Sequence, residues 1–412
     1  MFREAILNRR MLICIFTGFS SGLPLYILIS LLPAWLRSEQ VDLKAIGLFA
    51  LIQLPFTWKF IWSPLMDRFA WPLLGRRRGW ILLTQVALLL SLPLFGWFSP
   101  ALDIWTIAYL AAAVAFFSAS QDIVLDAFRR EILADVELGL GNAVHVNAYR
   151  IAGLVPGSLS LILADHLPWS SVFLITALFM LPGICMTLLV AEPQRVKAAP
   201  RTLREAVVEP FHEFITRAGW RQALLILAFI FFYKLGDSMA TALATPFYLD
   251  MGFTKTEIGL VAKHAGLWPA IIGGLLGGVW MIRLGINRAL WLFGVVQAVA
   301  ILGFALLASN GHSLALLAGV IGFEALGVGL GTTAFVAFIA RATHPLYTAT
   351  QFALFTSLAA VPRTLVNSAT GFLVEQLGWV NFFLLCTALA LPGMILLAKV
   401  APWREEGHSV QS

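Results

Sequence analysis

Long apolar runs follow one another along the whole chain, and they constrain its fold more than any other feature. A helix needs about 20 mostly apolar residues to cross the hydrocarbon core of a bilayer. Charged residues fill 12% of the 412 positions, roughly half the share of a soluble globular protein. The sequence therefore predicts an all-α integral membrane protein with 12 transmembrane helices. The runs are 11–35, 43–64, 80–98, 103–125, 140–164, 169–190, 222–248, 256–282, 288–308, 313–339, 347–373 and 379–399.

A single long polar connection divides these runs into six and six. The sequence thus predicts an N-terminal six-helix bundle at residues 1–190, a cytoplasmic linker at 191–221 and a C-terminal six-helix bundle at 222–412.

Short strings repeat across the two halves. Residues 41–48 align with 253–260, and residues 163–169 align with 373–379, at offsets of 212 and 210 positions. An even number of predicted helices separates the copies, so both halves would insert in the same sense. Two duplicated six-helix bundles are the plan of the major facilitator fold, in which a binding site lies between the halves near the membrane midplane.

The basic residues lie mainly on one side of the predicted helices. Of 28 Lys and Arg residues, twenty fall on the side of the linker and both termini, three on the other side, and five within helices. Cytoplasmic loops carry the excess of Lys and Arg, so both termini are predicted to be cytoplasmic. This placement explains the net charge of +6 without a nucleic-acid partner.

The sequence contains no pattern typical of a catalytic or metal site. The three cysteines lie far apart in apolar runs, so neither a metal site nor a disulfide is predicted. Nucleophile-elbow, metalloprotease and phosphate-loop motifs do not occur. We therefore expect no enzyme, no catalytic residue and no cofactor, and an ion or substrate gradient as the energy source. A membrane receptor that transports nothing is the alternative from a different class.

Ionisable side chains lie deep within several predicted helices. Each would cost about 2.5–3.5 kcal/mol at the bilayer centre on insertion scales, so they should face one another or a wet cavity. Burial favours the neutral form of a carboxyl group, which makes Asp237, Glu324 and Asp122 candidates for proton coupling. Alternatives remain: Asp237 lies three residues after Lys234 and could merely neutralise it, while Glu324 could form a permanent interhelical hydrogen bond. The deepest residues are Arg150, Lys234, Asp237, Glu324 and Arg363.

The deep cations suggest an anionic substrate. Arg150 and Arg363 keep their charge and present planar forks to carboxylates, although pairing with the deep acids is the competing interpretation. Lys234 and Lys263 extend this set, and Lys59 joins it unless it only snorkels to the interface. Aromatic rings near these charges could stack on sugars, with core packing as the alternative for each. The other predicted substrate-binding residues are Trp58, Gln121, Tyr149, Tyr233 and Trp268.

A basic loop follows the second predicted helix. The helix ends with Pro64-Leu-Met-Asp-Arg68, and Gly75-Arg-Arg-Arg-Gly79 follows. A helix-end Asp followed by Gly and a basic cluster resembles the loop motif of major facilitators, here with stretched spacing. The resemblance implies a gating loop built from Asp67, Arg68, Arg76 and Arg77.

Further strings, spread over helices 1 to 12, resemble one transporter family. They are Gly18-Phe-Ser-Ser-Gly-Leu-Pro24, Trp58-Lys-Phe-Ile-Trp-Ser-Pro-Leu-Met-Asp-Arg68, Gly75-Arg-Arg-Arg-Gly-Trp80, Ser118-Ala-Ser-Gln-Asp-Ile-Val124, Tyr149-Arg150, Tyr233-Lys-Leu-Gly-Asp237, Phe323-Glu324, Gly331-Thr-Thr-Ala-Phe-Val-Ala337, Ala349-Thr-Gln-Phe-Ala-Leu354 and Phe372-Leu-Val-Glu-Gln-Leu-Gly-Trp379. These strings are similar to the anhydromuropeptide permease (AmpG) family.

That resemblance implies a multi-pass importer of the bacterial inner membrane. Its cargo would be N-acetylglucosaminyl-1,6-anhydro-N-acetylmuramyl peptides, taken up with protons for peptidoglycan recycling and thereby feeding β-lactamase induction. The expected partners are muropeptide, protons and the lipid bilayer, and a monomer is the expected state. A siderophore, a drug or another bulky anion is the alternative cargo.

Overall fold

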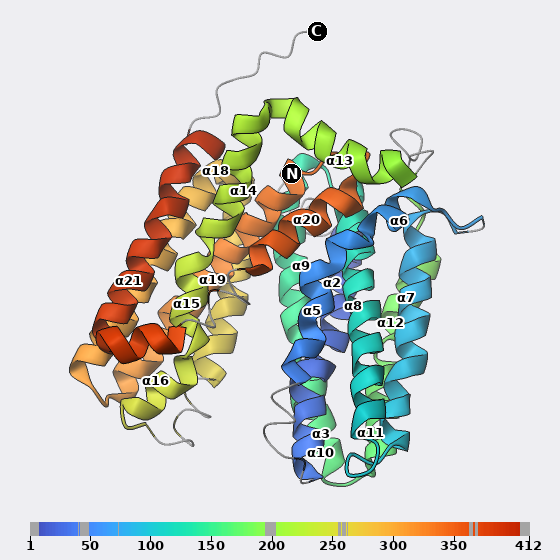
Figure 1. The fold of residues 1–412 in the computed structure, drawn as a ribbon, viewed down its shortest axis with the longest axis horizontal. Coiled ribbons are helices and arrows are strands. Elements are labelled where there is room, and N and C mark those ends of the chain that lie inside the picture. Colours follow the sequence, from blue (N-terminus) through green and yellow to red (C-terminus); the bar gives the residue numbers. More distant parts are fainter. Residues whose placement is uncertain are drawn as a thin grey trace. The chain divides into compact units, whose positions relative to one another are not determined.

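The structure is a computed structural model that describes residues 8–39, 41, 49–72, 74–193, 203–253, 257, 261, 263–361, 366 and 370–403. Helices make up nearly all of this part of the chain (Figure 1), which confirms the predicted all-α fold. Contacts group the chain into two units. Unit 1 comprises Met1–Ala134, Val144–Phe211 and Thr343–Ser357, and unit 2 comprises Asp135–Ala143, His212–Ala342 and Leu358–Ser412. The predicted bundle boundaries at 190 and 222 stay a prediction.

Apart from the second run, the helices up to the linker match the apolar runs of the first half closely. Three helices, α9, α13 and α20, contribute residues to both units. The elements up to the linker are α2 (Arg9–Tyr26), η1 (Ile27–Leu31), α3 (Leu32–Ser38), η2 (Phe49–Gln53), α5 (Leu54–Trp58), η3 (Lys59–Ile61), α6 (Ser63–Arg68), α7 (Arg77–Ser91), η4 (Leu92–Trp97), α8 (Ile104–Ile132), η5 (Asp135–Glu137), α9 (Leu138–Ala152), η6 (Val155–Leu159), α10 (Ser160–Ala164), α11 (Trp169–Leu178) and α12 (Leu181–Leu189).

The second predicted helix, 43–64, is not continuous where the structure describes it. It consists of the short segments η2, α5, η3 and α6, and residues 42–48 lie outside the described part. Pro55 and Pro64 stand in the first turn of α5 and of α6. A proline lacks the N–H that continues a helix and fits most easily in the first turn. The prolines therefore divide this run, and Lys59 lies in the 3₁₀ segment between them.

Aromatic side chains form the centre of the unit 1 core. Trp35 is 1% exposed, and its ring meets Phe95 at 6.3 Å and Phe173 at 5.1 Å between centroids. Helices α2 and α9 pack closely at the glycines of α2. A Cβ on Gly18 would overlap the backbone carbonyl of His145, so only glycine fits at this position. Small residues allow such close approach of helices in membrane proteins.

The helices of unit 2 follow the second set of runs. Two very long helices each contain one glycine with a positive φ, Gly285 at 74° and Gly378 at 71°, which marks a sharp kink. The elements, from the linker onward, are α13 (Leu203–Ala218), α14 (Trp220–Tyr233), α15 (Leu235–Ala242), α16 (Ala244–Asp250), α18 (Lys263–Asn310), α19 (Leu314–Ala342), α20 (Thr348–Val361) and α21 (Thr370–Val400).

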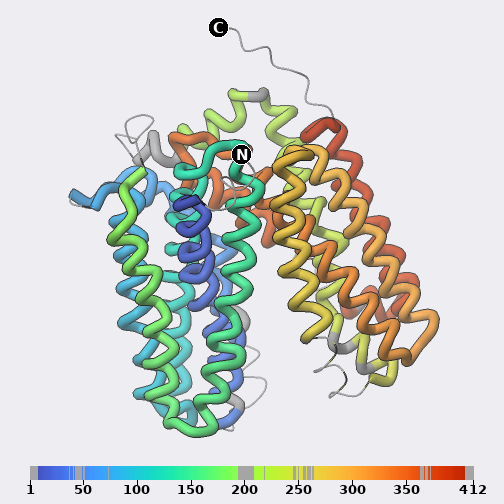
Figure 2. The backbone as a smooth tube through the Cα atoms, turned by 180° about the vertical axis from the view of Figure 1, so that it is seen from behind, coloured from blue at the N-terminus to red at the C-terminus, as the bar shows by residue number. Residues whose placement is uncertain are grey.

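Packing in unit 2 also centres on aromatic rings. Phe247, Phe304, Phe383 and Trp379 form a cluster in which Phe247 meets Phe383 at 4.8 Å between ring centroids. Helix α21 packs against α14, α15 and α18, and α18 packs along α19. The tube in Figure 2 follows α18 through its kink.

Nine helical stretches in the described part of the chain are long and apolar enough to cross a membrane. One of them, His264–Asn310, spans 47 residues, or about 70 Å at 1.5 Å per residue, more than twice the hydrocarbon thickness of about 30 Å. The kink at Gly285 falls between the predicted runs 256–282 and 288–308. The predicted number of twelve spans stays a prediction, because parts of several runs lie outside the described residues.

Candidate polar cavity and charged cluster

A cavity of about 570 Å³ opens in unit 2 beside the junction of α14 and α15. Its volume lies in the range of small-molecule sites. The wall carries hydroxyl groups of Ser238, Thr241 and Thr332 as well as the charged pair Lys234 and Asp237. Ala242, Val328 and Ala359 complete the lining. The cavity therefore offers both charges and neutral hydrogen-bonding groups within an otherwise apolar helix bundle.

A break in the helix positions the charged pair. Lys234 has φ −103° and ψ 0°, which ends α14, and α15 begins at the next residue. Asp237 lies in the first turn of α15, where a carboxylate is favoured by the helix dipole. Its Oδ2 lies 3.1 Å from Lys234 Nζ, and the two side chains are 15% and 14% exposed. The pairing predicted from the three-residue spacing is thus present, at the wall of the cavity.

Tyr233, the residue before the break, packs away from this cavity lining. It is 6% exposed, and its hydroxyl donates a hydrogen bond of 3.0 Å to the carbonyl of Leu290. Its ring stacks on Phe335 at 5.4 Å and 12°. These contacts fit the packing interpretation, and a role in substrate binding stays a prediction.

Glu324 lies on the cavity side of α19. Val328 and Thr332, which line the cavity, follow Glu324 by four and eight residues. Residues at this spacing share one helix face, so the half-buried Glu324 stands one turn beyond the lining. Trp268 on α18 is 55% exposed. Arg363 and the side chain of Lys263 lie outside what the structure describes.

Unit 1 brings together a second group of predicted residues. Lys59 is only 6% exposed, which argues against the snorkelling interpretation, and it interacts electrostatically with Asp122. Asp122 accepts a hydrogen bond of 2.5 Å from the Ser21 hydroxyl. Gln121 is fully buried and its Nε2 donates to the carbonyl and hydroxyl of Ser20, at 2.9 and 2.7 Å. These contacts connect η3, α8 and α2.

The remaining predicted residues of unit 1 are less deeply buried. Arg150 and Tyr149 are half-buried on α9, and the Tyr149 ring lies 5.5 Å from that of Tyr26. Trp58 is 56% exposed. Arg68 lies over the ring of Phe69, with its guanidinium carbon 4.9 Å from the ring centroid.

The other three gating-loop residues form a buried cluster of charges. Asp67 and Arg77 are both 0% exposed, with Asp67 Oδ1 2.8 Å from Arg77 Nη2. The same Nη2 lies 2.6 Å from Oε1 of Glu131, the acid near the end of α8. Arg76 Nη2 reaches this oxygen at 3.2 Å. One arginine thus joins the ends of α6, α7 and α8.

Asp67 also binds the start of α20. Its Oδ2 accepts hydrogen bonds of 2.8 Å from both the backbone N–H and the hydroxyl of Thr350, and its Oδ1 accepts one of 3.3 Å from the N–H of Ala349. The first N–H groups of a helix lack partners within the helix and attract negative charge. Asp67 therefore caps the helix that begins at Thr348 while neutralising Arg77.

Sequence reasoning missed three residues of this cluster. Glu131, Thr350 and Glu192 are not part of the loop that was identified, and Glu192 accepts hydrogen bonds from the N–H groups of Arg77 and Arg78 at 2.8 and 3.0 Å. Glu131 and Thr350 lie at helix ends, and Glu192 follows the last residue of α12 by three positions. An acid near a predicted cytoplasmic helix end, opposite an excess of arginine, is the signal that could have found Glu131 and Glu192.

Comparison with known proteins places this architecture in a family. The family model described as Major Facilitator Superfamily matches residues 14–366. An uncharacterized protein of Haemophilus influenzae is 51% identical over 416 residues, covering 99% of this chain and 98% of its own. The anhydromuropeptide permease of Escherichia coli (strain K12) is 43% identical over 390 residues, covering 94% of this chain and 79% of its own. The chain belongs to the anhydromuropeptide permease family of the major facilitator superfamily.

A solved structure shows the same fold. The human organic anion transporter MFSD10 (TETRAN) matches with a TM-score of 0.70 at 16% sequence identity, covering 94% of this chain and 99% of its own. Members of the major facilitator superfamily are multi-pass membrane transporters, so membership confirms the expectations of a transporter rather than an enzyme and of a membrane location.

Proposed function

We propose that this permease-family member imports N-acetylglucosaminyl-1,6-anhydro-N-acetylmuramyl peptides across the bacterial inner membrane by proton symport, for peptidoglycan recycling. The termini and the linker face the cytoplasm in this proposal. The observation that carries it is the Lys234–Asp237 pair, which stands at a helix break on the wall of a polar cavity. The 43% identity to the Escherichia coli anhydromuropeptide permease supports the choice of cargo.

The chemistry of the pair fits a charged cargo. A muropeptide carries free carboxylates, and the ammonium of Lys234 can bind one when Asp237 is neutral. Protonation of Asp237 would release Lys234 from its 3.1 Å partner, so proton uptake and carboxylate binding favour each other. Hydroxyl groups such as Thr241 and Thr332 would bind sugar or peptide groups. The proton and the substrate are then coupled because they share one ion pair.

Uptake into cells tests this proposal. The chain is expressed in a bacterium that lacks its own anhydromuropeptide permease, and entry of radiolabelled anhydromuropeptide is followed with and without an inward proton gradient. Wild type should restore uptake, and Asp237→Asn should abolish the part driven by the gradient. Glu375→Gln, at an exposed acid on α21, is the matched control and should transport normally.

Two results would contradict the proposal. Full gradient-driven uptake by Asp237→Asn would remove this residue from proton coupling. If the folded wild-type protein takes up a siderophore or another bulky anion but no muropeptide, the proposed cargo is wrong and that anion takes its place.

A further inference from the structure

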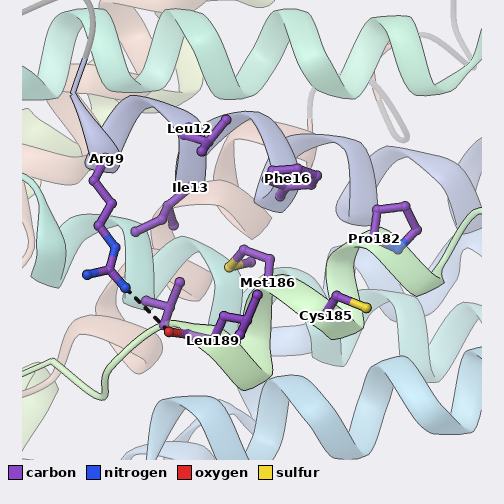
Figure 3. A pocket seen from close by; sticks show the side chains of 9 residues that line it. Arg9, Leu12, Ile13, Phe16, Pro182, Cys185, Met186 and Leu189 are labelled. Atoms are coloured by element: carbon purple, nitrogen blue, oxygen red, sulfur yellow. Dashed lines mark hydrogen bonds between the residues drawn. The ribbon is translucent and has the colours of Figure 1, made fainter.

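An apolar groove of about 460 Å³ runs along unit 1 between α2 and α12. Figure 3 shows its lining, which includes Leu12 and Phe16 on α2 and Cys185 and Leu189 on α12. Leu12 is 54% exposed and Leu189 is 77% exposed. In a protein of this membrane family such a face meets lipid tails, and the groove gives that contact a defined shape.

One end of the groove carries positive charge. The exposed Arg9 closes it, and Arg9 Nη2 donates a hydrogen bond of 3.3 Å to the carbonyl of Leu189 (Figure 3). Arg78 reaches the same helix end, with its Nε 2.9 Å from the Thr187 carbonyl and its Nη2 2.8 Å from the Leu188 carbonyl. The exposed Arg10 follows Arg9. Arg9 thus lines the groove itself, Arg10 follows it on α2, and Arg78 of α7 contacts the end of α12.

Glu192, two residues after the lining residue Val190, is already engaged. Both carboxylate oxygens of Glu192 accept hydrogen bonds from the first N–H groups of α7, at 2.8 and 3.0 Å. The dipole of that helix offsets part of the negative charge. Within the described part of the chain, Arg9 makes one hydrogen bond, of 3.3 Å to the Leu189 carbonyl, so this guanidinium, which has five N–H donors, can also donate to a ligand.

We propose that this groove binds one acyl chain of an anionic phospholipid, with Arg9 contacting the phosphate headgroup. Arg9 and Phe16 are seven residues apart, so the groove follows about 10 Å of helix, within the roughly 15 Å depth of one leaflet's hydrocarbon. Its position at a helix end places the arginine at headgroup level and the apolar lining at the level of the tail. A groove with such a charged end selects lipids by headgroup, which an apolar helix face alone does not.

Photocrosslinking tests the proposal in the full chain. The purified protein is reconstituted in nanodiscs that contain phosphatidylglycerol with a diazirine in its acyl chain, or the matched phosphatidylcholine, and crosslinked peptides are identified by mass spectrometry. Phosphatidylglycerol should label residues 12–16 and 182–190 about fivefold more than phosphatidylcholine, which is the preference expected for one basic side chain at a membrane surface.

Variants separate headgroup recognition from shape. Arg9→Gln should reduce labelling by phosphatidylglycerol to the level of phosphatidylcholine, while Arg221→Gln, an exposed arginine elsewhere, should leave the preference intact. Leu12→Trp should fill the groove and lower labelling by both lipids. Equal labelling by the two lipids in wild type, an unchanged preference in Arg9→Gln, or crosslinks to a copurifying protein instead of lipid would each overturn the proposal.

Discussion

Asp67→Asn should destabilise the protein more than any surface charge substitution. The carboxylate is 0% exposed and accepts hydrogen bonds from Arg77, Ala349 and Thr350. Removing one partner of a buried ion pair costs about 3–5 kcal/mol. Arg77 keeps Glu131 at 2.6 Å, and the amide oxygen of the new side chain can still accept one hydrogen bond. We therefore expect a loss near the lower limit, about 3 kcal/mol.

Thermal unfolding in detergent, followed by size-exclusion chromatography with fluorescence detection, measures this loss. At roughly 2.1 cal/mol/K of unfolding entropy per residue, 412 residues give a decrease in melting temperature of about 3–4 °C. Glu213→Gln, which breaks the partly exposed pair with Arg217 on α13, should lower it by less than 1 °C, since such pairs contribute about 0.3–0.5 kcal/mol.

A double-mutant cycle tests whether Asp67 and Glu131 are coupled through their common partner Arg77. Asp67→Asn combined with Glu131→Gln removes both anions from a guanidinium that is 0% exposed. The double variant should lose at least about 1 kcal/mol more than the sum of the single variants, because groups in one network couple by 0.5–3 kcal/mol. Additive losses would refute the coupling of the two acids through Arg77, and an Asp67→Asn protein as stable as Glu213→Gln would refute the cluster as a stabilising element.

Two further predictions concern packing in unit 1 and use the same unfolding measurement. Gly18→Ala should destabilise the protein by about 1–3 kcal/mol, because its Cβ would overlap the backbone carbonyl of His145. Gly157→Ala has open space around it and should unfold like wild type. Equal stability of the two variants would show that α2 and α9 are not in close contact at Gly18. Trp35→Ala should cost about 3–5 kcal/mol, since Trp35 is 1% exposed, and Trp97→Ala, 76% exposed, should cost little. An equal effect at both tryptophans would show that Trp35 is not part of a packed core.

Local sequence patterns predicted local structure well. Apolar runs such as 169–190 and 313–339 became helices with nearly the same limits, α11–α12 and α19, because helix formation in a membrane depends on continuous apolar length. The Lys234–Asp237 pair was predicted because its partners are only three residues apart in the sequence. The break at Lys234 was not predicted, since the residues around it contain neither proline nor an unusual run of polar side chains.

Contacts between segments far apart in the sequence could not be predicted in the same way. Asp67 was singled out from its loop motif, yet nothing near it in sequence points to Thr350, 283 residues away. Helix α13 was likewise missed, because the linker 191–221 was judged by its polarity and not by its helix-forming residues. Which helix ends meet in space depends on how the helices pack. The spacing of residues in a single sequence does not reveal this packing.

Binding of anhydromuropeptide to the purified protein tests the central claim, that Lys234 at the polar cavity binds a carboxylate of the cargo. Isothermal titration calorimetry would compare wild type with Lys234→Gln, and with Lys399→Gln at an exposed lysine on α21 as the matched control. A hydrogen bond to a charged group contributes at least about 1.5 kcal/mol, so Lys234→Gln should weaken binding by about tenfold or more while Lys399→Gln binds normally. Wild-type affinity in a folded Lys234→Gln protein would contradict the account.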